Sequence, residues 1–177
     1  SAPKMIILKE VTKDGYDFFT GVPDSGLKSF IKEIHKSEFE HIPATNEGQA
    51  IGIAVGAELV GMKSCVYLQN SGLGNAINPL ISPADNEVYA IPMIILIGWR
   101  GEPNTKDEPQ HIKQGKIMLP MIESMKMPYE ILSGEINGDK EIVKSLVKKA
   151  IDSQGPVFLI AKKGIFENYQ YTQIQHE

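Results

Sequence analysis

The sequence predicts an α/β fold, a three-layer sandwich with a mostly parallel central sheet of about six strands. Helical and strand patterns alternate along the chain, as they do where helices connect parallel strands. The run IPMIILIGW at 91–99 is uninterruptedly apolar and rich in branched residues, which is typical of a strand buried on both faces. Glycine and polar residues follow several of the predicted strands, where ligands bind in such folds.

Periodicity and capping signals place the elements in order along the chain. Predicted helices cover 4–15, 24–37, 71–82, 110–125 and 139–153, and the stretch 44–61 is predicted to run from the end of a strand into another helix. Predicted strands cover 16–23, 39–45, 63–70, 91–99, 129–132 and 156–161. Gly15 is the expected C-cap of the first helix, and Asp24 or Ser25 is the expected N-cap of the second. Pro120 is expected to kink the fifth helix or to mark its restart.

Length and composition indicate one domain, 1–166, followed by a polar C-terminal tail, 167–177. The 177 residues are 42% apolar and 23% charged, as in a soluble globular protein. The net charge of −4 argues against nucleic acid as a partner, and the longest apolar run is far shorter than the roughly 20 residues of a membrane span. The single cysteine, Cys65, excludes an internal disulfide and fits a cytoplasmic location.

Glu47 stands at the entrance of the predicted helix in ATNEGQAIGIAVGAELVG. As a first-turn acid it would complement the helix dipole, which is worth about 0.3–1 kcal/mol. The residues after it are so small that the helix must pack closely against something, because each glycine in a helix costs about 1 kcal/mol relative to alanine. A functional and a purely structural interpretation of Glu47 are both open at this point.

Several common kinds of site are disfavoured by the motifs. QNSGLGN at 69–75 is neither a dinucleotide fingerprint nor a P-loop, and Ser71 lacks the nucleophile elbow of α/β-hydrolases. The four histidines show no i,i+4 pairing and no cysteine partner, so no metal site is expected in this chain. A lone histidine such as His111 is more often a bystander than a catalytic group.

Four segments together resemble one family. TGVPDS, NEGQAIGIAVGA, QNSGLGNAINPL and IPMIILIGWRGEP…KDEPQHIKQG are similar to the pyrimidine-binding domain of thiamine-diphosphate-dependent 2-oxoacid decarboxylases. The resemblance covers about residues 5–165 and is greatest to the branch that acts on phosphonopyruvate. The sulfopyruvate branch, whose alpha subunits have this length, is second.

The resemblance implies a role for each candidate residue. Glu47 would hydrogen-bond the aminopyrimidine of thiamine diphosphate and favour the tautomer that removes the thiazolium proton. Asp24 would line the reacting end of the cofactor and transfer a proton or orient the substrate. His111 lies where relatives carry one or two active-site histidines, although the pair here is Gln110-His111. The residues expected to border the cofactor are Pro23, Asn70, Ser71 and Gly72.

Arg100 is a candidate ligand for a phosphonate or sulfonate tail, because the guanidinium group forks onto such oxygens. An ion pair with Glu102 or Asp107 is the equally weighted alternative.

The resemblance also implies that the chain is incomplete as an enzyme. Thiamine enzymes hold the diphosphate and Mg²⁺ on a second domain with a Gly-Asp-Gly stretch, and NGDK at 137–140 does not fit that pattern. We therefore expect a carboxy-lyase half that shares its cofactor with a diphosphate-binding domain or beta subunit, in a homodimer or larger hetero-oligomer. A non-catalytic assembly or regulatory domain of the same fold is the alternative of another class.

Overall fold

The computed structural model describes residues 5–169, which form a six-stranded parallel sheet. The strands are β1 (Tyr16–Gly21), β2 (Glu40–Pro43), β3 (Lys63–Gln69), β4 (Met93–Trp99), β5 (Tyr129–Ile131) and β6 (Pro156–Lys162). Their spatial order is β2-β1-β3-β4-β6-β5, and each adjacent pair is parallel. The predicted fold class and strand count are confirmed.

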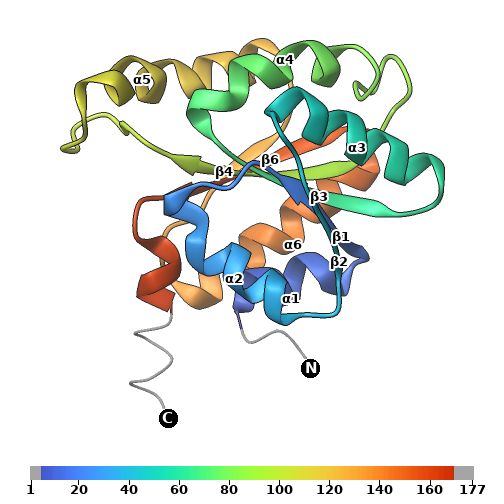
Figure 1. Ribbon diagram of the computed structural model, residues 1–177, viewed down its shortest axis with the longest axis horizontal. Helices are drawn as coiled ribbons and strands as arrows, with labels where there is room; N and C mark the ends of the chain where they lie inside the picture. The colour runs from blue at the N-terminus through green and yellow to red at the C-terminus, as the bar shows by residue number, and fades with distance from the viewer. Residues whose placement is uncertain (1–4, 170–177) are drawn as a thin grey trace.

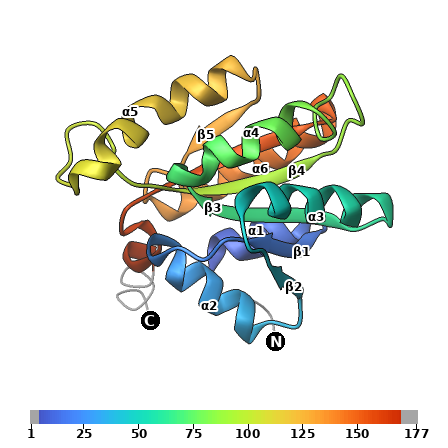
Figure 2. The same cartoon turned by 45° about the horizontal axis from the view of Figure 1, so that its top comes forward.

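Helices cover both faces of this sheet (Figure 1). On one face lie α1 (Ile6–Lys13), α2 (Lys28–Lys36) and α6 (Ile136–Ser153). On the other lie α3 (Glu47–Leu59), α4 (Leu73–Ile81) and α5 (Pro109–Ser124), which come forward in Figure 2. Two 3-10 turns, η1 (Ser25–Leu27) and η2 (Asn70–Gly72), connect β1 to α2 and β3 to α4.

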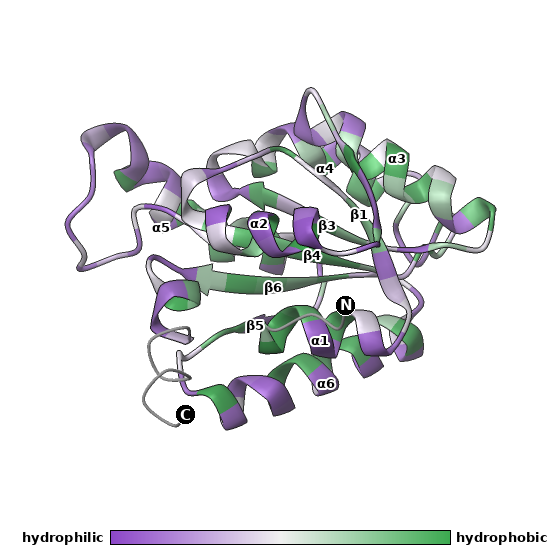
Figure 3. Ribbon diagram, turned by 60° about the horizontal axis from the view of Figure 1, so that its bottom comes forward, coloured by the Kyte–Doolittle hydropathy of each residue, from purple (hydrophilic) through white to green (hydrophobic). Residues whose placement is uncertain are grey.

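Each face of the sheet has its own apolar core, because successive side chains of a strand point to opposite sides. In β4, Ile94 and Leu96 pack toward α1, α2 and α6, whereas Ile95 and Ile97 pack toward α3, α4 and α5. All seven residues of this strand are buried, as the apolar run predicted. In Figure 3 the central strands are coloured as hydrophobic along most of their length.

The direction in which the chain adds strands to the sheet reverses at β1. The chain passes from β1 to β2 on one side and then returns to β3 on the other side of β1. Parallel α/β sheets bind ligands in the crevice at the carboxyl ends of the strands that flank such a switch. The crevice expected here lies beyond Gly21 and Gln69, which end β1 and β3.

The helices start or end up to four residues from the predicted bounds, and two of them correct a specific prediction. Helix α6 begins at Ile136 rather than 139, because the carboxylate of Glu135 caps it by accepting bonds from the amides of Asn137 (3.1 Å) and Gly138 (2.5 Å). NGDK therefore lies in the first turns of a helix. Helix α5 is continuous through Pro120, so the alternative that the helix restarts there is wrong.

The packed domain extends beyond the expected boundary at residue 166. Residues 165–169 are helical, and the Tyr169 side chain is only 2% exposed. Its hydroxyl donates to the buried carboxylate of Asp139, which also accepts from the amides of Ser133 (2.7 Å) and Gly134 (2.8 Å). The rest of the predicted tail, 170–177, lies outside the described residues. Across residues 5–169, none of the helices combines the length and apolarity that crossing a membrane requires.

Candidate active site

Parallel pairing brings the carboxyl ends of four strands together. Gly21 of β1 is in register with Pro43 of β2 and Tyr67 of β3, and Gln69 is in register with Gly98 of β4. The segments that follow these strands carry the candidate residues, so the clusters that are separate in sequence share one edge of the sheet.

Glu47 is the first residue of α3, and its carboxyl group lies against Gly72. A Cβ atom on Gly72 would be 2.2 Å from Glu47 Oε1, so only glycine leaves room for this carboxyl position. The other oxygen, Oε2, accepts a hydrogen bond from Asn75 Nδ2 at 3.1 Å. Asn46 caps the helix by accepting from the Gln49 amide at 2.8 Å, so Glu47 is free to point away from the helix end.

Asp24 follows β1 and is held by two donors. Its Oδ2 accepts from the Gly26 amide at 3.1 Å, and its Oδ1 accepts from Gln69 Nε2 at 2.7 Å. Ser71 in turn donates to Gln69 Oε1 at 2.5 Å. Because Gly72 is next to Ser71, contacts connect Asp24 to Glu47 through Gln69, Ser71 and Gly72. We call this row of five residues the carboxylate chain.

Gln69 is a member of the carboxylate chain that the sequence did not single out for a role. Its position directly at the end of a strand, before Asn70 and Ser71, is the only signal that could have indicated it. Asn75 is not part of the carboxylate chain, but it is a second residue to which the sequence gave no role; its contact with Glu47 joins α4 to α3.

Asn70 joins two loops through its buried side chain. Its Nδ2 donates to the Arg100 carbonyl and its Oδ1 accepts from the Arg100 amide, both at 2.9 Å. The side chain is therefore occupied in holding the end of β3 beside the end of β4. Any contact of Asn70 with a cofactor would come from its backbone.

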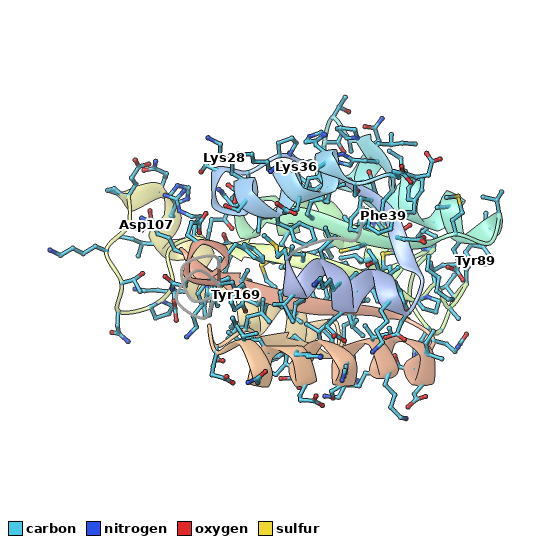
Figure 4. All side chains as sticks on the ribbon, turned by 90° about the horizontal axis from the view of Figure 1, so that it is seen from below. Lys28, Lys36, Phe39, Tyr89, Asp107 and Tyr169 are labelled. Carbon is cyan, nitrogen blue, oxygen red and sulfur yellow. The ribbon has the colours of Figure 1, made fainter. Side chains whose placement is uncertain are left out.

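Arg100 forms a forked ion pair with Asp107. Figure 4 labels Asp107 in the loop that precedes α5. Arg100 Nε and Nη2 lie 3.1 Å and 2.9 Å from the two carboxylate oxygens, and the amides of Gly101 and Glu108 also donate to Asp107. These hydrogen bonds, that from Arg100 first, hold the pKa of Asp107 well below its usual range. Of the two alternatives for Arg100, the structure contains the ion pair with Asp107, whereas Glu102 pairs with Lys162.

His111 lies in the first turn of α5. Its Nε2 is 3.9 Å from Glu108 Oε2. A Cβ atom added to Gly101 would lie 1.9 Å from the carbonyl oxygen of His111. Helix α5 packs against η2, which places it beside the carboxylate chain. Within the described residues, His111 makes no hydrogen bond to Asp24 or Glu47.

The residues present fit the aminopyrimidine half of thiamine diphosphate. Glu47 offers a half-buried carboxyl group beside a wall that lacks a side chain at Gly72, a setting that suits a flat ring with a basic nitrogen. Pro23 is exposed beside Asp24 at the same edge. In residues 5–169 no group of three or more His, Cys, Asp or Glu side chains is placed to hold a metal ion.

Comparison with known proteins agrees with this fold. Residues 4–120 match the family described as thiamine pyrophosphate enzyme, N-terminal TPP binding domain. The chain belongs to this family.

Relatives extend the comparison to individual proteins. The chain is 37% identical over 124 residues to the sulfopyruvate decarboxylase subunit alpha of Methanococcus maripaludis, covering 70% of this chain and 72% of the relative. It is 38% identical over 122 residues to a phosphonopyruvate decarboxylase of Streptomyces viridochromogenes, covering 67% of this chain but 30% of the relative.

Among solved structures, the benzoylformate decarboxylase of Polynucleobacter necessarius superposes with a TM-score of 0.67 at 21% identity, covering 93% of this chain and 30% of that one. At that identity the likeness concerns the fold alone.

Proposed function

We propose that the chain is the pyrimidine-binding half of a thiamine-diphosphate-dependent decarboxylase whose substrate is a 2-oxoacid with an anionic tail. The first candidate reaction converts phosphonopyruvate and a proton into phosphonoacetaldehyde and CO2. Sulfopyruvate is the alternative substrate, favoured by the relative that matches this chain over most of its length. The observation that carries the proposal is the carboxylate chain, which connects Glu47 to Asp24.

The two carboxyl groups have different tasks. Thiamine diphosphate, when bound, supplies the carbon nucleophile and the electron sink for decarboxylation. Glu47, which does not have to cap its helix because Asn46 does so, shares a proton with a ring nitrogen at Oε1 or Oε2. Asp24, held by Gln69 and Gly26, orients the substrate and returns a proton to the carbon that lost CO2. The hydrogen bonds of Gln69 and Ser71 hold the Asp24 carboxyl group in a fixed position relative to Glu47.

We propose that a second domain or a beta subunit completes the site and holds the diphosphate and Mg²⁺. Helices α3 and α4 carry no charged residue from Gly48 to Ala57 and from Leu73 to Ile81, and they expose Leu59 (75%) and Ile81 (48%). This uncharged outer surface, coloured mostly pale or hydrophobic along α3 in Figure 3, suits a permanent contact with the partner or with a second copy of the chain.

Calorimetry tests the shared site. The isolated chain should bind thiamine diphosphate with Mg²⁺ weakly or not at all, and the complex with its partner should bind the cofactor tightly. Tight binding by the isolated chain would contradict the shared site.

Activity tests the chemistry. The complex should release CO2 from phosphonopyruvate or sulfopyruvate, measured side by side, and Glu47→Gln should lower that rate by about 10²-fold or more. A complex that assembles but releases no CO2 would favour the non-catalytic assembly domain.

A further inference from the structure

A cavity of about 260 Å³ opens beside Asp24. It lies between η1 and the segment that follows β6, at the same sheet edge as the carboxylate chain. The residues that line it include Asp24, Gly98, Arg100, Ala161, Lys162 and Lys163.

Two small residues create this hollow. Gly98 of β4 and Ala161 of β6 are paired in register, so the surface of the sheet is low where the two strands meet. A Cβ atom on Gly98 would lie 2.9 Å from Asp24 Oδ2 and 3.2 Å from Leu27 Cγ, so a larger residue would push into the Asp24 turn. The cavity therefore reaches the side of Asp24 that faces away from Gln69.

All but one of the charged groups in the cavity wall have a hydrogen-bond or ion-pair partner within the described residues. Arg100 is paired with Asp107, and Lys162 lies 3.2 Å from Glu102. Glu167 accepts a hydrogen bond from Ser29 at 2.9 Å, and both oxygens of Asp24 accept bonds. Lys163 alone among these charged groups has no hydrogen bond or ion pair with any residue between 5 and 169.

We propose that this cavity binds the anionic tail of the substrate and that the Lys163 ammonium group is its charged ligand. This inference depends on the proposed function. Asp24 at the reacting end repels a substrate with two anionic groups, so an unpaired cation on the opposite wall is needed to hold the tail. A lysine on a flexible stem adapts to phosphonate or sulfonate oxygens, whereas Arg100 would first have to break its fork with Asp107.

Steady-state kinetics of the complete complex tests Lys163. Removing one charge-assisted contact by Lys163→Gln should raise KM for the anionic-tailed substrate about 10- to 100-fold, with kcat within about twofold of wild type. Lys163→Arg should restore most of the affinity. The KM for pyruvate, which has no anionic tail, should not change, and Lys144→Gln, a lysine on the outer side of α6, should behave as wild type.

A binding measurement with the isolated chain separates this inference from the proposed function. Phosphonoacetate should shift the NMR signals of the Gly98 and Gly164 amides, acetate should not, and Lys163→Gln should abolish the shift. An active wild-type complex whose KM and whose phosphonoacetate shifts are unaffected by Lys163→Gln would overturn the tail site. If neither oxoacid is decarboxylated by wild type, the proposed function fails, and the NMR titration still decides whether the cavity takes a phosphonate.

Discussion

Individual glycines of this chain have very different surroundings, although they look alike in sequence. At Gly72 an added Cβ would meet the carboxyl group of Glu47, and at Gly21 it would meet the backbone and ring of Tyr67. At Gly52, Gly56 and Gly74 it would meet no atom within 4 Å. The first pair therefore fixes the position of functional or core side chains, whereas the other three leave open surface.

Gly72→Ala should displace Glu47 and lower the decarboxylation rate by about 10²-fold or more, by loss of the acid–base group from its position. The backbone of Gly72 (φ −87°, ψ −7°) is accessible to alanine, so the fold should remain intact. Activity of the complex and circular dichroism of the chain measure the two effects. Gly74→Ala is the matched control and should retain activity; equal losses in both variants would contradict the role of Gly72.

At the scale of elements, side-chain contacts connect neighbouring strands in addition to the backbone hydrogen bonds of the sheet. Asn70 ties the end of β3 to the end of β4. Tyr67 of β3 reaches across β1, where Gly21 has no side chain, and its hydroxyl lies 2.6 Å from His41 Nε2 on β2. Both connections lie near the carboxyl edge of the sheet, where they keep the site-bearing loops in fixed relation.

Asn70→Ala should destabilise the chain by about 1–3 kcal/mol, because it leaves the amide and carbonyl of Arg100 without their partner. Urea unfolding followed by fluorescence of Trp99 measures the change. Asn78→Ala on the exposed side of α4 is the control and should change stability by less than about 0.5 kcal/mol. A loss at Asn70 no greater than that of the control would show that the hydrogen bonds between Asn70 and Arg100 contribute no net stability.

The burial of His41 makes stability depend on pH. Burial, and then the neighbouring His35 ring at 4.8 Å, lower the pKa of His41 below its usual value of about 6.5, so the folded chain disfavours the protonated form. The unfolded chain takes up this proton more readily, so stability should fall as pH drops below about 6.5. The urea midpoint should be lower at pH 5.5 than at pH 7.5. The difference should shrink in His41→Gln, and a variant with the full wild-type difference would exclude His41 as its source.

At the scale of the whole molecule, the two helical layers present different outer surfaces. Helices α1, α2 and α6 carry lysines on their outer sides, such as Lys28 and Lys36, which Figure 4 labels on α2. Helices α3 and α4 are uncharged along their middle and expose glycine and aliphatic residues. Tyr89, 69% exposed, lies at the end of the molecule opposite Asp107 in Figure 4, so the apolar surface is not confined to the active-site edge.

If α3 packs against a partner, Gly52→Ala and Gly56→Ala should have opposite effects on the chain and on the complex. Each should stabilise the isolated chain by about 0.5–1 kcal/mol, because alanine favours the helix and meets no atom there. Each should weaken association, measured by sedimentation. Lys9→Ala, on the opposite helical layer, should leave association unchanged, and tighter association of the glycine variants would refute a close contact at α3.

The sequence by itself determined the order and type of the elements, the buried strand β4 and the gathering of Asp24, Glu47 and the QNSG segment at strand ends, because periodicity and capping are local properties. It also carried the family resemblance, which the comparisons confirm. Only the tertiary structure decided that Arg100 pairs with Asp107, that Gln69 links Asp24 to Ser71, and that Gly98 and Ala161 meet in register beneath a cavity. Strand register and side-chain partners join residues far apart in the chain, and packing sets them.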